Sequence, residues 1–429
     1  MATPLRPLST AQQANYDLIT ANLQEILKPE IIHSALLASR PVRIYWGTAT
    51  TGRPHAGYFV PALKLAQFLR AGCHVTVLLA DLHAFLDADK APESTLEARV
   101  GYYERVIKSL LRSVGVDLSR LAFVRGAEYQ LSAAYMRDLL RLSKRVSMHD
   151  ATKASSEVVK QSGEPVMADG LYPLMQALDE QYLDVDAQFG GVDQRKIFAL
   201  ANDHLGKLGY RTRAHLMNPM VPGLAGGKMS SSDPGSKIDL LEDEGVLRKK
   251  VARAHCAPGV VEGNGILAFI QHVLLPFSAL QAADSRPSIS ILSKDGGSSS
   301  SSAPTVYSDF AAIASAYEKD LITPQQAKRV VEEGLVALMR PIREEYEEDA
   351  EWQEIAQRGY SDPDGLKKEE VKARKKAEQE RKREAAKAYQ AKQKQGQGQE
   401  ETVANDGLAD GVKDLTLDGG DTPTTKASS

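Results

Sequence analysis

The sequence contains little cysteine and no long apolar run. Its 429 residues include only Cys73 and Cys256 as cysteines, which excludes a disulfide scaffold and a cysteine-based zinc site and favours a reducing compartment. No uncharged apolar run approaches about 18 residues, and the N-terminal residues contain no apolar signal core. We therefore expect neither membrane insertion nor secretion.

A large net charge of one sign is also absent. The chain has 53 Lys and Arg residues and 56 Asp and Glu residues, a formal net charge of −3, which excludes a basic coat over the whole surface. Residues 366–394, however, contain 12 Lys or Arg and 5 Glu, a net charge of +7, so the rest of the chain carries −10. This basic arm is interpreted either as a helix that follows RNA phosphates or as a solvated tail that aids solubility.

Strand-like runs alternate with helical stretches between residues 41 and 240. The runs lie at 42–46, 75–80, 121–124, 185–189 and 215–217, and helical periodicity covers 62–69, 96–114, 133–142 and 197–205. This alternation predicts an α/β domain with a Rossmann-like, doubly wound parallel sheet. The stretch within about 96–170 is too long for a simple crossover, so we expect a helical insertion there.

The segments on either side of this domain have different patterns. Residues 1–40 predict an N-terminal helical segment, and residues 241–360 predict an α-helical domain. Within the helical domain, 288–292 and 305–307 predict a hairpin. Residues 361–429 predict a charged, largely disordered tail that contains the basic arm.

The first motif, YWGTATTGRPHAGY at residues 45–58, lies where the first core strand ends. Pro54 is expected to begin the next helix, which would place His55 and Gly57 in a first turn whose free N–H groups favour phosphate. Pro61 requires that the regular helix begins near residue 59 or kinks. For this segment alone, a plain strand–turn–helix with a surface histidine remains an alternative.

The second motif, GGKMSSSD at residues 226–233, combines glycines, Lys228 and three hydroxyls. Ammonium, hydroxyl and backbone N–H donors suit a phosphate chain. The segment is not a P-loop, because it follows no buried strand in the required arrangement. Taken alone, it is better interpreted as a solvated Gly/Ser loop.

The third motif places Tyr172, Gln176 and Asp179 on one helical face, because their offsets are four and seven residues. A phenol, an amide and a carboxylate in a row suit recognition of a small polar ligand, although boundary residues that meet water remain an alternative. His83 follows the strand at 75–80, and it is either a pocket residue or a structural histidine.

The fourth motif, FGGVDQRK at residues 189–196, is another strand end followed by a helix. Its glycines allow close approach of a ligand, and Asp193 can accept from ribose hydroxyls. Taken singly, this motif is a weak signal.

In this order, the four motifs resemble those of class I aminoacyl-tRNA synthetases. The segment from His55 to Tyr58 is similar to the HIGH-type signature, and Lys228 to Ser232 is similar to the KMSKS-type signature. Tyr45, the third motif and the GGVDQRK stretch resemble the tyrosyl-tRNA synthetases of the eukaryotic and archaeal cytosolic type. The similarity runs from about residue 16 to residue 360.

The resemblance implies that the chain activates L-tyrosine with ATP and transfers it to tRNA(Tyr) for cytosolic translation. It also implies an anticodon-binding function for residues 241–360 and a homodimer. ATP is expected to act with Mg²⁺ as a substrate, with no tightly bound cofactor and no metal site in the protein. The location expected is the cytoplasm, and the basic clusters of the tail permit a minor nuclear pool.

The resemblance further implies roles for individual residues. The phenol of tyrosine is assigned to Tyr45 and Asp179, and its α-amino end to Tyr172, Gln176 and Gln194. The implied ATP contacts are Gly47, His55, Gly57, Asp193, Met220, Val221, Lys228 and Met229. The implied catalytic group is His55, Gly57, Lys228, Ser230, Ser231 and Ser232.

The chemistry fits these residue types. The tyrosine carboxylate is already a nucleophile, so activation requires alignment of two anions and stabilisation of a pentacoordinate phosphorus rather than a general base. Phenylalanine would leave Tyr45 and Asp179 buried without a partner, which favours tyrosine.

Two positions depart from the signatures. The last signature histidine is Tyr58 here, and the second lysine of the KMSKS-type motif is Ser231. We hypothesise that a monovalent cation or Lys237 compensates for the missing charge.

Two other functions remain as alternatives. A tryptophanyl-tRNA synthetase would share the architecture, but an indole offers only an N–H donor to Tyr45 and Asp179. An inactive RNA-binding relative would not need to retain His55, Gly57 and Lys228.

Overall fold

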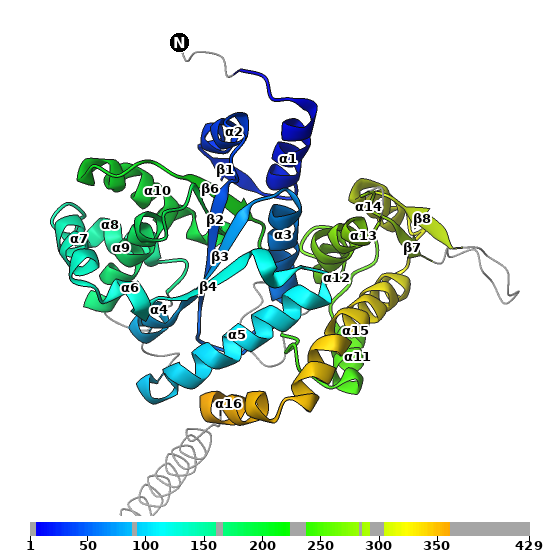
Figure 1. The fold of residues 1–429 in the computed structure, drawn as a ribbon. Coiled ribbons are helices and arrows are strands. Elements are labelled where there is room, and N and C mark those ends of the chain that lie inside the picture. Colours follow the sequence, from blue (N-terminus) through cyan, green and yellow to red (C-terminus); the bar gives the residue numbers. More distant parts are fainter. Residues whose placement is uncertain are drawn as a thin grey trace, which may run out of the picture. The chain divides into compact units, whose positions relative to one another are not determined.

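The computed structural model describes residues 6–87, 92–159, 166–223, 237–282, 285–291 and 304–360 (Figure 1). The chain divides into two units, Met1–Ser361 and Asp362–Ser429, and every described residue belongs to the first. The predicted tail and the KMSSS motif at residues 228–232 lie outside the described residues. Within the described ranges, no helix is both long enough and apolar enough to cross a bilayer.

Six strands form the central sheet, in the order β1-β6-β5-β2-β3-β4. Their bounds are β1 Glu25–Leu27, β2 Arg43–Ala49, β3 His74–Ala80, β4 Leu121–Arg125, β5 Ala187–Gly191 and β6 Ala214–Asn218. The strands from β2 to β6 pair in parallel, and β1 pairs antiparallel with β6. The Rossmann-like parallel sheet that the alternation predicts is therefore confirmed, with one antiparallel edge strand added.

The N-terminal segment differs from the expectation of helix alone. It contains α1 (Thr10–Thr20) and α2 (Pro29–Leu37), with strand β1 between them. Ser9 caps α1 through a reciprocal capping box with Gln12, and Pro29 occupies the first turn of α2, where its missing N–H costs nothing. A three-residue edge strand is too short to show an alternating pattern, so no sequence signal indicated β1.

Two groups of helices cover the two faces of the sheet (Figure 1). On one face, α3 (Phe59–Arg70) and α5 (Leu96–Ser113) share a core with Ile44 and Trp46 of β2. Tyr45 points to the other face, because successive strand side chains alternate, and there it meets α9 (Met167–Tyr182). Helices α7 (Ala133–Ser143), α8 (Met148–Ser155) and α10 (Arg195–His204) pack against α9.

The helical region after residue 241 contains six α-helices and a hairpin in its described part. The bounds are α11 Glu244–Arg253, α12 Gly265–Phe269, α13 Leu275–Gln281, α14 Phe310–Glu318, α15 Pro324–Glu348 and α16 Ala350–Tyr360. The predicted hairpin is confirmed as β7 (Ile289–Ile291) paired with β8 (Thr305–Tyr307). Helices α12 and α13 are separated by a π-helical turn at Ile270–Leu274, because Pro276 supplies no N–H to the regular ladder.

Candidate functional site

A cavity of about 300 Å³ opens beside the carboxyl ends of β2 and β5. The chain leaves β2 towards β3 on one side and returns through β5 on the other, so this is the point where the strand order reverses. Seven of the residues to which the resemblance assigns a role line the cavity: Tyr45, Gly47, Tyr172, Gln176, Asp179, Asp193 and Gln194.

Three elements deliver these residues. Strand β2 carries Tyr45 and Gly47, and the predicted stripe of α9 faces the cavity as the helical offsets require. The 3₁₀ turn Val192–Gln194 after β5 carries the last two. Nε2 of Gln176 donates to Oε1 of Gln194 at 2.8 Å, which joins α9 to this turn.

Asp179 is completely buried in the wall of the cavity. Its Oδ1 accepts from Nε2 of Gln130 at 2.8 Å, from Oη of Tyr129 at 2.8 Å and from Oη of Tyr135 at 3.0 Å. Burial raises the pKa of Asp179 to about 7, although these three hydrogen bonds act in the opposite direction. Its Oδ2 has no hydrogen-bond partner among the described residues, so one carboxylate oxygen remains available to a donor.

Tyr45 is the second buried polar group on this side of the cavity. Its Oη donates to the backbone carbonyl of Gln176 at 3.2 Å. Burial, followed by the nearby charge of Asp179, raises the pKa of Tyr45 well above its ordinary value. The hydroxyl is therefore neutral, and its lone pairs can accept a hydrogen bond.

His83 belongs to the cavity, which answers the question that the sequence left open. Its ring meets Tyr172 edge-on at 4.7 Å between centroids, and its Nε2 lies 3.9 Å from Oδ2 of Asp179. Burial lowers the pKa of His83 to about 4, so the imidazole is neutral.

The sequence did not indicate Tyr129, Gln130 or Tyr135. They come from α6 (Ala127–Gln130) and the start of α7, directly after β4. The one available signal was their position after the predicted strand at 121–124, at the same edge of the sheet. The cavity also has further lining residues that the motifs did not assign a role: Trp46, Thr48, Ala49, Thr51, Tyr58, Leu78, Ala80, Asp87, Val158 and Gln188.

His55 caps a short 3₁₀ turn, Ala56–Tyr58, rather than lying inside a helix that begins at Pro54. The regular helix α3 begins at Phe59, which agrees with the first of the two possibilities that Pro61 allowed. The Nδ1 of His55 accepts from the N–H of Gly57 at 3.2 Å, so the ring proton is assigned to Nε2. Burial and then the charge of Lys237 lower the pKa of His55 to about 4, which leaves a neutral ring with an N–H to donate.

The segment that follows the second motif pairs with the first motif. The N–H of Ala56 donates to the carbonyl of Ile238 at 2.8 Å, and His55 forms an isolated β-bridge with Asp239. Lys228, Met229, Ser230, Ser231 and Ser232 lie outside the described residues, and the described chain resumes at Lys237, whose next two residues pair beside His55.

A second cavity, of about 750 Å³, shares Asp193 with the first. Met220 and Val221 line it, together with Val192, Arg195 and Lys196. His55 and Gly57 are not among the described residues that line either cavity, whereas Tyr58 lines the first. In the described part of the chain, no three His, Cys, Asp or Glu side chains are grouped as metal ligands.

Sequence comparisons identify similar proteins. The model of a family described as tRNA synthetases class I (W and Y) matches residues 37–340. The cytoplasmic tyrosine–tRNA ligase of Saccharomyces cerevisiae is 52% identical over 349 residues, which are 80% of this chain and 87% of that protein. The cytoplasmic tyrosine–tRNA ligase of Danio rerio is 51% identical over 348 residues, which are 81% of this chain but 63% of that protein. This chain thus spans less than two thirds of the Danio rerio relative.

Solved structures show the same likeness. The tyrosyl-tRNA synthetase of Archaeoglobus fulgidus, complexed with L-tyrosine, aligns with a TM-score of 0.69 at 32% identity and covers 78% of this chain and 98% of that one. A tryptophanyl-tRNA synthetase of Aeropyrum pernix K1 aligns with a TM-score of 0.57 at 20% identity over 76% of this chain and 83% of that one. The second likeness concerns the fold alone.

Proposed function

The chain belongs to the class I tRNA synthetases for tryptophan and tyrosine, as a tyrosyl-tRNA synthetase of the cytosolic type, and we propose that it binds tyrosine and ATP at two ends of one cleft. This cleft consists of the two cavities that share Asp193. The chain is a tyrosine–tRNA ligase (EC 6.1.1.1) that activates tyrosine with ATP and charges tRNA in the cytoplasm. The roles of the individual residues below are proposals.

At the first end, Oδ2 of Asp179 and the hydroxyl of Tyr45 hold the phenol of the substrate. The observation that carries this assignment is the buried Oδ2, which has no hydrogen-bond partner in the described part of the chain. The ionised carboxylate of Asp179 accepts a hydrogen bond from the phenol O–H, and the hydroxyl of Tyr45 forms a hydrogen bond with the phenol oxygen. Tyr172, Gln176 and Gln194 hold the α-amino end of the substrate.

This arrangement favours tyrosine over its two nearest competitors. Phenylalanine offers no hydroxyl, so Oδ2 of Asp179 would stay buried without a donor and the hydroxyl of Tyr45 would gain no substrate partner when it binds. The indole of tryptophan is larger and has a donor but no acceptor, so it can use only one of the two groups. The tryptophanyl function is correspondingly the weaker candidate.

At the second end, the nucleotide lies along residues 47 to 57 and the turn after β5. The neutral Nε2–H of His55 and the N–H groups of the 3₁₀ turn donate to phosphate oxygens, and Asp193 accepts from the ribose. Met220 and Val221 lie along the adenine. ATP enters with Mg²⁺ on its phosphate oxygens, as a substrate, and no tightly bound cofactor is required.

Adenylate formation needs no base from the protein, because the tyrosine carboxylate attacks the α-phosphorus directly and pyrophosphate leaves. The site contributes alignment and donors for the charge that develops. Lys228 and the serines at 230–232 close over the leaving pyrophosphate. Lys237, whose charge already acts on His55, replaces the missing second lysine of the motif, with a monovalent cation as the alternative.

The enzyme is proposed to act as a homodimer that binds tRNA through its helical region. Support for the dimer comes from exposed apolar side chains that cluster in sequence around α7, α8 and the start of α9: Leu131, Met136, Leu140, Met148, Val166 and Met167. Such a group on a soluble protein is typical of an interface. The helices of residues 241–360 form the proposed anticodon-binding domain, and the basic arm adds salt-dependent contacts to phosphates.

ATP–pyrophosphate exchange tests the function. Exchange is expected with tyrosine and not with tryptophan or phenylalanine offered separately, and tyrosylation of tRNA(Tyr) should follow. Absence of exchange with tyrosine would contradict the proposal, and exchange with tryptophan would favour the alternative enzyme. The same assay with Lys237→Ala, in K⁺ and in Na⁺, decides what replaces the missing lysine, since indifference to both changes would exclude both candidates.

A further inference from the structure

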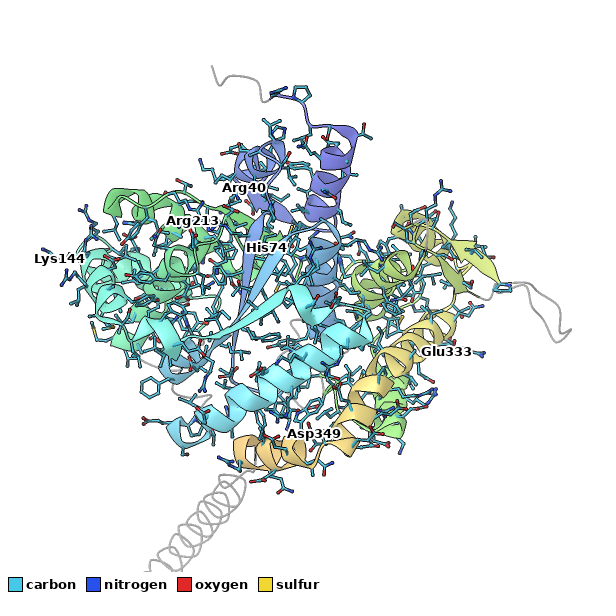
Figure 2. The ribbon with its side chains drawn as sticks, in the orientation of Figure 1. Arg40, His74, Lys144, Arg213, Glu333 and Asp349 are labelled. Carbon is cyan, nitrogen blue, oxygen red and sulfur yellow. The ribbon has the colours of Figure 1, made fainter. Side chains whose placement is uncertain are left out.

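The last described helix, α16, packs along α5 (Figure 1). Its Tyr360 contacts Arg53 in the loop that leads to His55. Helix α16 follows α15 directly, at the turn where Figure 2 labels Asp349. The loop is residues 50–54, between the end of β2 and the 3₁₀ turn of the first motif. None of the four motifs includes α16, and the reaction proposed above gives this helix no role.

Arg99 of α5 joins this loop to the end of α16. Its Nη1 donates to the carbonyl of Thr51 at 2.7 Å, and its Nε donates to the carbonyl of Gly359 at 3.0 Å. The same guanidinium lies over the ring of Tyr360, 4.9 Å from the centroid. Because Thr51 lines the cavity, this contact fixes part of the cavity wall.

The next two loop residues are held by the same helices. The hydroxyl of Tyr103 donates to the carbonyl of Gly52. The guanidinium of Arg53 lies against a pair of tyrosine rings that contact each other, 5.1 Å from the centroid of Tyr360 and 5.7 Å from that of Tyr102. Three consecutive loop residues are thus anchored from outside the site.

We propose that Arg99 and Tyr360 are positioning residues for the nucleotide step, and that α16 acts as a clasp on residues 50–54. The clasp is defined as Arg99, Tyr102, Tyr103 and Tyr360. It sets where His55 and Gly57 meet the phosphates, so its loss should affect ATP far more than tyrosine, even though Thr51 of the held loop lines the first cavity. The inference rests on the proposed role of His55 and Gly57.

Two substitutions of Tyr360 test the clasp. The Oη of Tyr360 is buried and has no hydrogen-bond partner among the described residues, so Tyr360→Phe keeps every clasp contact. Tyr360→Ala removes the ring from both arginines. We expect Tyr360→Ala to lower kcat/KM for ATP in exchange by about tenfold or more, because small displacements of positioning groups cost rates of this order. Tyr360→Phe should stay within about twofold of the wild-type chain.

The readout that separates positioning from general damage is the dissociation constant of tyrosine, measured without ATP by equilibrium dialysis. It should stay within about twofold in Tyr360→Ala, because none of the residues assigned to tyrosine belongs to the clasp or to residues 50–54. If Tyr360→Ala fails to fold, Arg99→Met serves in its place, since it keeps the aliphatic stem and loses the bonds to Thr51 and Gly359.

Arg105→Ala is the matched control. Arg105 also joins α5 to α16, through Glu351 at 2.7 Å and Asp349 at 3.5 Å, and it does not anchor the loop. Exchange by Arg105→Ala should stay within about twofold of wild type even if its melting temperature falls. The clasp is overturned if Arg105→Ala or Tyr360→Phe slows exchange as much as Tyr360→Ala, or if tyrosine binding weakens equally.

Failure of the proposed function gives a different result. In that case the wild-type chain itself does not exchange with tyrosine. Calorimetric binding of Mg-ATP then still decides the clasp, because the dissociation constant must rise in Tyr360→Ala and stay unchanged in Tyr360→Phe. Equal ATP affinities for wild type and Tyr360→Ala would contradict the clasp.

Discussion

Two aspartates that are seven residues apart in the chain are buried at opposite ends of the parallel strands, here called the carboxyl edge and the amino edge of the sheet. Their surroundings shift their pKa values in opposite directions. At the carboxyl edge, Asp179 is surrounded by neutral donors, and burial raises its pKa to about 7. At the amino edge, Asp186 accepts from Arg40 at 2.6 Å and from Arg211 at 3.1 Å. Burial alone would raise the pKa of Asp186, but the hydrogen bonds of Arg40 and Arg43 lower it to about 2.

The difference separates a structural carboxylate from a functional one. Arg40, labelled beside α2 in Figure 2, belongs to a set of arginines that neutralise Asp186 completely, so nothing remains for a ligand. Asp179 keeps one oxygen without a hydrogen-bond partner among the described residues, and its charge is costly until a donor arrives. A buried carboxylate with one oxygen that lacks a hydrogen-bond partner among the described residues therefore marks the substrate-binding edge of this sheet.

Exchanging each aspartate for asparagine should give opposite results, and this is the largest effect expected. Asp179→Asn removes the charged acceptor for the phenol, so kcat/KM for tyrosine should fall about a hundredfold in exchange, in line with a hydrogen bond to a charged group. Asp186→Asn should leave exchange within about twofold and lower the free energy of unfolding by about 2 kcal/mol at pH 7, from its lowered pKa.

Each variant is the control for the other, because both remove one buried carboxylate while keeping its shape. Chemical denaturation and exchange kinetics on the same preparations provide the measurements. If Asp186→Asn weakens exchange as strongly as Asp179→Asn, the division between the two edges is wrong.

One methyl group added to either of two neighbouring glycines should impair only one end of the cleft. A Cβ on Gly190 would lie 2.5 Å from Oε1 of Gln194, which bonds Gln176, whereas a Cβ on Gly191 would overlap the carboxylate of Asp193. We expect Gly190→Ala to raise KM for tyrosine and Gly191→Ala to raise KM for ATP, each by about tenfold.

Gly206→Ala is the control for this pair, since a Cβ there meets no atom within 4 Å. Steady-state exchange with one substrate varied at a time gives the two KM values. An equal rise in both KM values for either variant would show that the two ends are not independent.

The pH dependence should differ between the two ends, with a smaller effect. Tyrosine should bind about tenfold more tightly at pH 8 than at pH 6, because Asp179, with a pKa near 7, is mostly protonated at the lower pH. His55, with a pKa of about 4, stays neutral throughout this range and should add no such dependence to ATP binding. Equilibrium dialysis of each substrate across this range measures both.

The shifted pKa values of Asp179 and Asp186 make the free energy of unfolding change with pH in opposite directions. A raised pKa means that the folded state holds a proton that the unfolded chain has lost, so Asp179 makes stability fall as pH rises from about 4 to about 7. The lowered pKa of Asp186 stabilises the fold above about pH 4, and this contribution is lost as pH falls towards 2.

A tyrosine affinity that does not change with pH in the wild-type chain, or one that keeps its pH dependence in Asp179→Asn, would contradict the assignment of Asp179 to the phenol.

Much of the fold and part of the site could be predicted from the sequence, because both depend on local periodicity. Buried strands show as short apolar runs, and the offsets of Tyr172, Gln176 and Asp179 are enough to place them on one helical face. Strand β1 was not predictable, because three residues cannot display a period. The cap formed by His55 was also missed, because Pro54 and Pro61 allowed more than one local geometry.

The sequence by itself determined the alternation of the parallel strands with helices, the residue types available for chemistry and the resemblance that names the reaction. Tertiary structure alone decided which oxygen of Asp179 is hydrogen-bonded. Its Oδ1 accepts from Tyr129, Gln130 and Tyr135, about fifty residues earlier in the chain, and its Oδ2 has no hydrogen-bond partner among the described residues. Tertiary structure also decided that α16 anchors a loop about three hundred residues earlier. The physical reason is that burial and the field of distant neighbours set the charge and the position of a side chain, and a one-dimensional pattern contains neither.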